Sequence, residues 1–285
     1  MDILSAAQSQ TPVVLHASDL HIGAHMPETL ARFTRLANSL LPQLIIFSGD
    51  LTDGGRATEY QELAAYLQTF DAPIFIVPGN HDAPVDNMVT RIFQPFAQFD
   101  ALPAFKNVYQ SQAIDVGELR TAGPIQMRLD WSKGITNQRR TDQALRRFCH
   151  PKNNVSAPQT LPYRILVGHH PIIDAPDVAV SGSVVGGLEA LTRCEDFGVD
   201  MILSGHTHQS WFGHINGSKI LLATAPTLSS PRIRGEGQGF HAYSIGQHDV
   251  TCNVWRWDTS DFALEATKIH LRTTKVQRSK EPTNL

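Results

Sequence analysis

Five short clusters of aspartate, asparagine and histidine, each following an apolar run, constrain the fold more than any other feature of the sequence. The apolar runs are typical of buried strands, so each cluster is expected at the carboxyl end of a strand, where open α/β sheets bind ligands. Six of the thirteen histidines fall in these clusters, which argues against a random distribution of histidine along the chain. The clusters are Asp19-Leu20-His21, Gly49-Asp50, Gly79-Asn80-His81-Asp82, Gly168-His169-His170 and Gly205-His206-Thr207-His208.

Strand and helix patterns alternate in the first half, which favours parallel pairing with right-handed crossovers. Strands are expected at 13–17, 44–47 and 74–77, with amphipathic helices at 29–41 and at 58–70, the latter capped by Thr58. An irregular insertion with short helical turns follows at 83–104, and short strands are expected within 105–130, for example at 126–130.

The second half continues with helices at 141–148 and 188–197, a polar loop at 153–162, and strands at 165–167, 201–203, 240–245 and 251–257. Asn216-Gly217 predicts a hairpin over 211–223. No repeat or clear linker is visible. We therefore expect a flexible N-terminus at 1–12, one domain of two packed sheets at 13–270, and a polar C-terminal tail at 271–285.

Composition narrows the possible partners. The chain has 285 residues, is 41% apolar and carries a formal charge of −3, so no global basic field attracts nucleic acid or an anionic membrane. Three widely spaced cysteines without a CxxC exclude a disulfide framework and indicate buried, reduced thiols. With no signal peptide pattern and no long apolar stretch, we expect a cytoplasmic protein without a membrane span. A homodimer remains open.

The spacing within the clusters suggests shared ligands. In an extended segment residues i and i+2 point to the same side, so Asp19 and His21 are expected to face one ion, and His206 and His208 two adjacent ions. The glycines that open four clusters would let the backbone turn sharply. Carboxylate, amide and imidazole ligands without thiolate suit Mn²⁺, Fe or Zn²⁺ better than Ca²⁺.

The ordered set DxH, GD, GNHD, GHH and GHTH resembles the calcineurin-like metallophosphoesterase superfamily, from about Val13 to Ala223. Together with GDLTDGG and SGHTH, it looks most like the bacterial cyclic-nucleotide phosphodiesterase-like branch. The resemblance implies an α/β fold, a four-layer α/β/β/α sandwich with two mixed β-sheets. It also implies two divalent metal ions (Mn, Fe or Zn) as cofactors.

The resemblance also implies a role for each position. One ion would be held by Asp19, His21 and His208, the second by Asn80, His169 and His206, and Asp50 would bridge both. A hydroxide bridging the ions would attack phosphorus in line, while His81, the implied catalytic residue, would protonate the leaving group. The alternative for His81 is a structural, hydrogen-bonded histidine.

The sequence also suggests roles for several residues near the expected ligands. Asn80, His170, Arg232 and Arg234 are candidates for substrate contact, although His170 could instead brace the site and the loop at 229–237 could be an ordinary solvated loop. Asp82 is expected to orient a neighbouring group from behind the metal ligands. We expect Asp53 to cap a loop rather than bind metal.

The leading functional hypothesis is a phosphodiesterase acting on cyclic nucleotides or other small diesters. The alternative is a phosphomonoesterase or broad-range phosphohydrolase. A nuclease is less favoured because no extended basic or aromatic stretch for a nucleic acid polymer is evident. A non-catalytic scaffold would have no reason to retain the whole set of site residues, and nucleotide storage or sensing by binding alone remains a further alternative.

Overall fold

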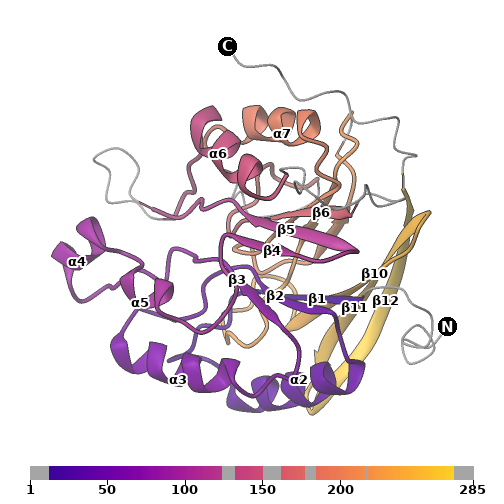
Figure 1. Cartoon of the computed structure of the whole chain (residues 1–285). Coiled ribbons are helices and arrows are strands. Elements are labelled where there is room, and N and C mark those ends of the chain that lie inside the picture. The colour runs from indigo at the N-terminus through magenta and orange to yellow at the C-terminus, as the bar shows by residue number, and fades with distance from the viewer. Residues whose placement is uncertain (1–12, 124–131, 150–161, 177–183, 216, 273–285) are drawn as a thin grey trace.

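Two six-stranded mixed β-sheets lie face to face between two layers of helices (Figure 1). The computed structural model describes residues 13–123, 132–149, 162–176, 184–215 and 217–272. The four-layer α/β/β/α arrangement expected from the sequence is therefore confirmed.

The first sheet has the strand order β12-β11-β10-β1-β2-β3. Its three N-terminal strands run parallel, as alternating strands and helices predict, while β10, β11 and β12 are antiparallel. Helices α2 and α3 connect the parallel strands and cover one face of this sheet. The elements are β1 (Val13–Ala17), α2 (Pro27–Leu40), β2 (Leu44–Phe47), α3 (Ala57–Leu67), β3 (Ile74–Ile76), β10 (Gly239–Ile245), β11 (Asp249–Asp258) and β12 (Asp261–Leu271).

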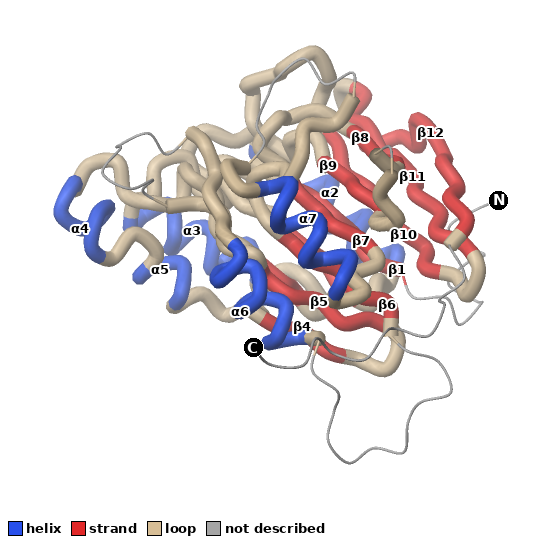
Figure 2. Tube along the Cα trace, turned by 90° about the horizontal axis from the view of Figure 1, so that it is seen from above, coloured by secondary structure: helices blue, strands red, loops and turns tan. Residues whose placement is uncertain are grey.

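The second sheet has the order β4-β5-β6-β7-β9-β8, and α6 and α7 pack on its outer face (Figure 2). The expected hairpin is present as β8 and β9, although Asn216 of its turn lies outside the described residues. Its elements are β4 (Val108–Gln110), β5 (Ile114–Glu118), α6 (Gln138–Phe148), β6 (Tyr163–Val167), α7 (Gly187–Asp196), β7 (Met201–Ser204), β8 (Trp211–Gly213) and β9 (Leu221–Thr224). The insertion, which follows β3 and precedes β4 along the chain, contains α4 (Met88–Phe93) and α5 (Ala97–Asp100).

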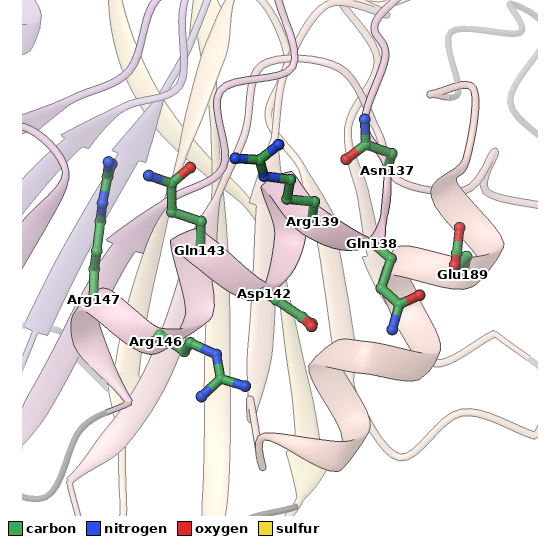
Figure 3. Close-up of a pocket in the computed structure, with 8 residues that line it drawn as sticks. All are labelled: Asn137, Gln138, Arg139, Asp142, Gln143, Arg146, Arg147 and Glu189. Carbon is green, nitrogen blue, oxygen red and sulfur yellow. The ribbon is translucent and has the colours of Figure 1, made fainter. Parts of the chain in front are cut away.

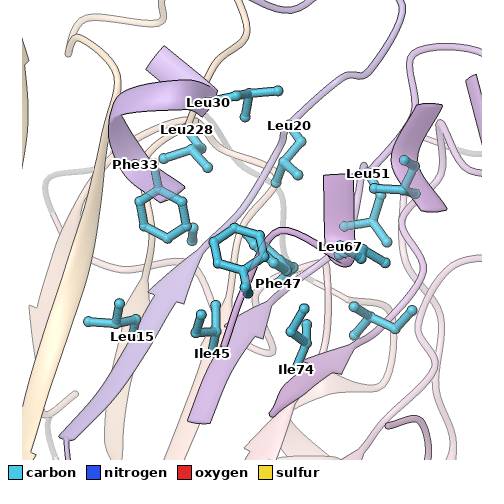
Figure 4. Packing of buried hydrophobic residues seen from close by; sticks show 14 of the residues in the cluster. Leu15, Leu20, Leu30, Phe33, Ile45, Phe47, Leu51, Leu67, Ile74 and Leu228 are labelled. Atoms are coloured by element: carbon cyan, nitrogen blue, oxygen red, sulfur yellow. The ribbon is translucent and has the colours of Figure 1, made fainter. Parts of the chain in front are cut away.

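Strand alternation divides the apolar side chains among three layers. Leu15, Ile45 and Phe47 point towards α2 and α3, where Phe33 packs against them (Figure 4). The intervening side chains of β1 and β2, such as Val14, face the second sheet. A third cluster fills the space under α6 and α7. All three cysteines are buried and free, as expected.

Three expectations about secondary structure need correction. Thr58 does not cap α3: the helix begins at Ala57, Arg56 is the N-cap, and Glu59 accepts the Arg56 N–H at 3.1 Å. The sequence did not predict β12, which pairs along β11 as an edge strand. Leu271, the first residue of the expected polar tail, is the last residue of this strand.

Some expectations fall outside the described residues. These are the strand at 126–130, the polar loop at 153–161, the N-terminus at 1–12 and the tail beyond residue 272. Among the residues that are described, no helix combines the length and apolar character needed to cross a membrane.

Candidate metal centre

The five polar clusters meet at one edge of the sandwich, because each follows a strand of one of the two sheets. Backbone hydrogen bonds join loops of the first sheet, from Asp19 N–H to the Gly49 carbonyl and from His21 N–H to the Asp50 carbonyl, both at 3.0 Å. The second sheet is tied in where His206 N–H donates to Oδ2 of Asp19 at 3.0 Å. The carboxylate of Asp19 is fully buried at this junction.

The backbone at the site is not extended. Asp19 and His21 do lie close together, but the expected cause, an extended segment in which residues i and i+2 face the same side, is wrong. Five of the seven expected ligands have left-handed backbone angles, with φ between 49° and 69°: Asp19, His21, Asp50, His206 and His208. Non-glycine residues adopt this region rarely, at a cost of about 1–3 kcal/mol each, and such residues cluster at functional sites. The convergence of side chains arises from these kinks rather than from strand alternation.

Glycines serve the site mainly by allowing close approach. A Cβ at Gly79 would overlap Oδ1 of Asp50, and a Cβ at Gly205 would overlap the side chain of Ser18. Of the glycines that open the clusters, Gly49 is the one with a positive φ, at 97°. The expectation of a sharp glycine turn therefore holds there, while Gly79 and Gly205 are needed for space.

Asp19, His21 and His208 form one buried group of possible ligands, and their ligand atoms lie within 4.8 Å of one another. Nε2 of His208 lies 3.1 Å from Oδ1 of Asp19, and Nε2 of His21 lies 3.9 Å from the same oxygen. Nε2 of His21 is also 3.9 Å from Oδ2 of Asp50, which places Asp50 between this group and the next.

The second group gathers around His169. Nε2 of His169 lies 3.2 Å from Oδ2 of Asp50, and the His169 ring centroid is 5.1 Å from that of His206. His170 joins them, because its ring nitrogen lies within 4.8 Å of those of His169 and His206. Asn80 follows Gly79 in the neighbouring loop, and its Oδ1 is buried without a hydrogen bond.

Two of the histidines are oriented in the same way by the backbone. Nδ1 of His169 contacts the Ser48 carbonyl at 2.9 Å, and Nδ1 of His208 contacts the Arg232 carbonyl at 2.8 Å. Because a carbonyl only accepts, each Nδ1 carries the hydrogen, and each Nε2 is left to face an aspartate. Metal-binding histidines are commonly oriented by such a hydrogen bond from the other ring nitrogen.

The unbonded polar atoms fit divalent cations. Buried polar groups normally have hydrogen-bond partners, yet Oδ1 of Asp19, Nε2 of His21, Nε2 of His169 and Oδ1 of Asn80 have none. A neutral His169 would direct the Nε2 lone pair at the Asp50 carboxylate, which is repulsive unless a cation lies between them. These donors, two carboxylates with imidazoles and an amide, therefore suit a metal site.

The charged groups of the two ligand sets strongly affect one another's pKa values. Burial alone would lower the pKa of His169, but the Asp50 and Asp19 carboxylates together raise it to about 9. Burial would raise the pKa of Asp50, yet His169 and the other nearby histidines hold it well below its ordinary value. At His206, burial and the charge of His169 outweigh the effect of the same two carboxylates and lower the pKa to about 4.

Asp82 braces the site from behind. Its Oδ2 accepts the N–H groups of Gly79 at 2.7 Å and Leu51 at 3.2 Å, and its Oδ1 accepts the N–H and the hydroxyl of Thr52, both at 2.9 Å. The side chain is completely buried. It thus holds together the loops that carry Asp50 and Asn80.

Sequence reasoning missed the place of Asp53. Its Oδ1 lies 3.3 Å from Nδ1 of His21 and 3.3 Å from Nη2 of Arg232, so it faces the site instead of capping a loop. Its carbonyl also contacts Nδ1 of His81 at 2.7 Å. No spacing rule in the sequence signals this arrangement.

Three of the remaining candidates lie at the rim, and the fourth, His170, is buried. The His81 ring is partly exposed, and its centroid is 4.7 Å from that of His21. Arg232 and Arg234 are exposed, and Arg234 reaches the His206 carbonyl at 3.4 Å. His170 is buried, with Nδ1 at 3.1 Å from the Thr121 hydroxyl and Nε2 unbonded.

A separate open hollow of about 1040 Å³ runs along α6 (Figure 3). It is lined by Asn137, Gln138, Arg139, Asp142, Gln143, Arg146, Arg147 and Glu189. None of these residues belongs to the five clusters, and the lining contains no histidine. The aspartate and histidine clusters therefore lie outside this hollow.

Two relatives carry phosphodiesterase names. A probable cyclic nucleotide phosphodiesterase of Ruthia magnifica is 25% identical over 207 residues, covering 70% of this chain and 76% of the relative. A probable glycerophosphodiester phosphodiesterase of Arcobacter nitrofigilis is 44% identical over 41 residues. That match spans 14% of this chain and only 15% of the length of the relative.

Solved structures share the fold at low identity. Purple acid phosphatase PPD1 from yellow lupin has a TM-score of 0.63 and 13% identity, covering 92% of this chain and 54% of its own. A dimetal phosphatase from Danio rerio has a TM-score of 0.55 and 10% identity, covering 92% of this chain and 99% of its own. The calcineurin-like phosphoesterase model matches residues 12–210, which hold all five clusters. On that match, this chain belongs to the calcineurin-like phosphoesterase family.

Proposed function

We propose that this protein is a dinuclear-metal-dependent phosphodiesterase that hydrolyses cyclic nucleotides or other small phosphodiesters. The observation that carries the proposal is the convergence of buried, unbonded ligand atoms around Asp50. The relative from Ruthia magnifica is named as a probable cyclic nucleotide phosphodiesterase, and the match covers most of its length. This supports the choice of a diester.

The chain offers a ligand set for two ions. One would be held by Asp19, His21 and His208, the other by Asn80, His169 and His206, with Asp50 shared. When bound, divalent ions supply positive charge for the phosphate ester and lower the pKa of water to about 7. The carbonyls of Ser48 and Arg232 would keep Nε2 of His169 and of His208 facing the ions. Oδ1 of Asp53 lies 3.3 Å from Nδ1 of His21, which leaves Nε2 of His21 as its ligand atom.

His81 is the proposed proton donor to the leaving alkoxide. Because its Nδ1 donates to the Asp53 carbonyl, Nε2 is the atom left to hold and deliver the proton. A positioned general acid contributes about 10²–10⁴ in rate. Since no carboxylate engages Nε2 within the described residues, the ring is free to face the substrate from the rim.

Arg232 and Arg234 are proposed to contact the phosphate. A guanidinium can bind two phosphate oxygens at once, and both side chains are exposed beside the site. Arg232 is balanced by Asp53 at 3.3 Å, which keeps its head group near His21. His170 is proposed to lie behind the ligands, where Thr121 fixes its ring.

The test is a substrate panel with metal-reconstituted protein. Chelator-treated protein would be loaded with Mn²⁺, Fe²⁺ or Zn²⁺ and assayed on 3′,5′-cyclic AMP, 2′,3′-cyclic nucleotides, glycerophosphodiesters, nitrophenyl mono- and diesters and single-stranded DNA. Asp50→Asn, purified in parallel, reports any contaminating phosphatase. We expect two ions per chain and turnover of small diesters above that of monoesters.

Each alternative has its own result. Turnover confined to monoesters would replace the diesterase proposal with a phosphomonoesterase. Binding of nucleotide without turnover, in protein that holds two ions, would favour storage or sensing. A chain that retains no divalent ion would overturn the metal-dependent proposal as a whole.

A further inference from the structure

A continuous chain of hydrogen-bonded side chains lies buried between the two sheets. His16 and His241 are directly opposite each other in the antiparallel pairing of β1 and β10, and Tyr243 lies two residues further along β10. The Tyr243 hydroxyl is 3.2 Å from Nδ1 of His16 and 2.9 Å from Nδ1 of His241. All three side chains are fully buried.

This chain of hydrogen bonds ends at a serine hydroxyl on each side. Nε2 of His16 is 2.8 Å from the hydroxyl of Ser48, and Nε2 of His241 is 2.7 Å from the hydroxyl of Ser210. Ser48 is fully buried, whereas Ser210 is half-buried. Burial holds the pKa of both histidines far below the ordinary value, to about 3 for His16, so both rings are neutral at pH 7.

Neutral rings allow only two directions for the hydrogen bonds. Each ring donates with one nitrogen and accepts with the other, and the Tyr243 hydroxyl donates once, so reversing one bond reverses all four. If His16 donated to Ser48, the buried Ser48 hydroxyl hydrogen would have no acceptor in the part of the chain that the structure describes. The satisfied direction therefore runs outward from Ser48, and Ser210 can donate to water.

Both ends of the chain lie next to proposed metal ligands. The Ser48 carbonyl accepts Nδ1–H of His169, and Ser48 is two residues before Asp50. Ser210 is two residues after His208 and precedes β8 of the second sheet. The buried chain thus connects the loop after β2, in the first sheet, with the loop after β7, in the second.

We propose that Ser48, His16, Tyr243, His241 and Ser210 form a directional hydrogen-bond chain that positions the two halves of the metal site relative to each other. The proposal rests on the metal-binding function proposed above. His16 and Tyr243 act as positioning residues through Ser48 and Ser210, since neither is among the proposed ligands. The direction of the chain assigns His16 as the Nδ1–H tautomer and His241 as the Nε2–H tautomer.

The first measurement is long-range ¹H–¹⁵N NMR of the Zn²⁺-loaded protein, which distinguishes the two neutral tautomers and the imidazolium. We expect His16 protonated at Nδ1 and His241 at Nε2, with both rings neutral from pH 5 to pH 8. The opposite tautomers, or an imidazolium at either position, would overturn the directional chain. If the Zn²⁺-loaded protein is not obtained, the tautomers of His16 and His241 can be measured in metal-free protein.

The second measurement compares Zn²⁺ affinity in Tyr243→Phe and Tyr163→Phe. Both tyrosines are buried in the cluster between the sheets, but Tyr163 lies on β6 and is not part of the chain. Removing a group that orients metal ligands typically weakens metal binding 10–100-fold. We expect such a loss for Tyr243→Phe and less than about a threefold change for Tyr163→Phe, a difference that a merely structural role for both residues would not produce.

Equal affinities in the two variants would overturn the positioning role even if the tautomers are as assigned. If Tyr243→Phe does not fold, Ser210→Ala gives the comparison, because it leaves Nε2–H of His241 without its acceptor. Wild-type protein that binds no Zn²⁺ would overturn the proposed function and the positioning role together. In that case, the tautomers of His16 and His241 would still show whether the directional hydrogen-bond chain exists.

Discussion

Replacing Asp82 by asparagine tests whether the loops of the metal site are held by the buried carboxylate behind them. The carboxylate accepts four hydrogen bonds, two on each oxygen, and three of the donors are backbone N–H groups. Asparagine keeps one oxygen and turns an NH₂ group towards the other two donors. If the NH₂ group faces Thr52, the Thr52 hydroxyl can still donate to the His81 carbonyl at 3.3 Å, and only the Thr52 N–H loses its acceptor. A buried donor left without an acceptor costs about 1–3 kcal/mol, so we expect Asp82→Asn to lose at least about 1–3 kcal/mol of unfolding free energy.

The matched control is Glu59→Gln. Glu59 is also a buried carboxylate that accepts backbone N–H groups, from Gly54 at 2.9 Å and Arg56 at 3.1 Å, but neither residue adjoins a proposed ligand. Urea unfolding at pH 7 should show a loss in both variants, while metal titration should show weaker binding in Asp82→Asn alone. An Asp82→Asn protein within 1 kcal/mol of wild type, or with unchanged metal affinity, would refute the reasoning.

Four other changes have defined outcomes. Asp50→Asn should lower the content of both ions together in metal analysis, because Asp50 lies between the two ligand groups; two ions retained per chain would contradict this. His81→Ala should reduce kcat/KM by about 10²–10⁴ on alkyl diesters but little on nitrophenyl diesters, whose leaving group hardly needs a proton; equal losses would remove its role as an acid. Gly205→Ala should abolish metal binding, since its Cβ would overlap Ser18, and wild-type affinity would show that the loop can shift. Stability should fall by about 1.4 kcal/mol per pH unit below pH 6.5 for a histidine buried as a neutral ring, because the unfolded chain takes up the proton; His241→Gln should flatten that slope in urea midpoints from pH 4 to 7.

The parallel part of the fold was predictable because its strands are buried on both faces. The runs at 44–47 and 165–167 are continuously apolar, and the run at 13–17 is apolar except for His16. The edge strand β12 was not predictable in the same way. Most of its side chains are exposed, and Glu265 and Lys268 interrupt its apolar residues, so only pairing with β11 reveals it.

The residues of the candidate site were predictable, whereas the geometry that unites them was not. Histidine and aspartate after buried strands indicate a metal site by residue type alone. The positive φ angles of Asp19 and His208, and the turn that brings Asp53 towards His21, depend on contacts between loops of different strands. The pairing of His16 with His241 depends likewise on the antiparallel register of β1 and β10, which is set over more than two hundred residues.

The strained backbone and the unbonded ligand atoms have a common explanation. Left-handed residues at Asp19, His21 and Asp50 each cost free energy, and so do buried polar atoms without partners. Such costs persist only where the surroundings impose them, and here Asp82, the Ser48 carbonyl and the hydrogen bonds between loops do so. The fold therefore holds the candidate ligands in place by itself, and the proposed binding of cations would offset the strain. For the same reason, the residues that brace the loops should matter for metal affinity as much as the ligands do.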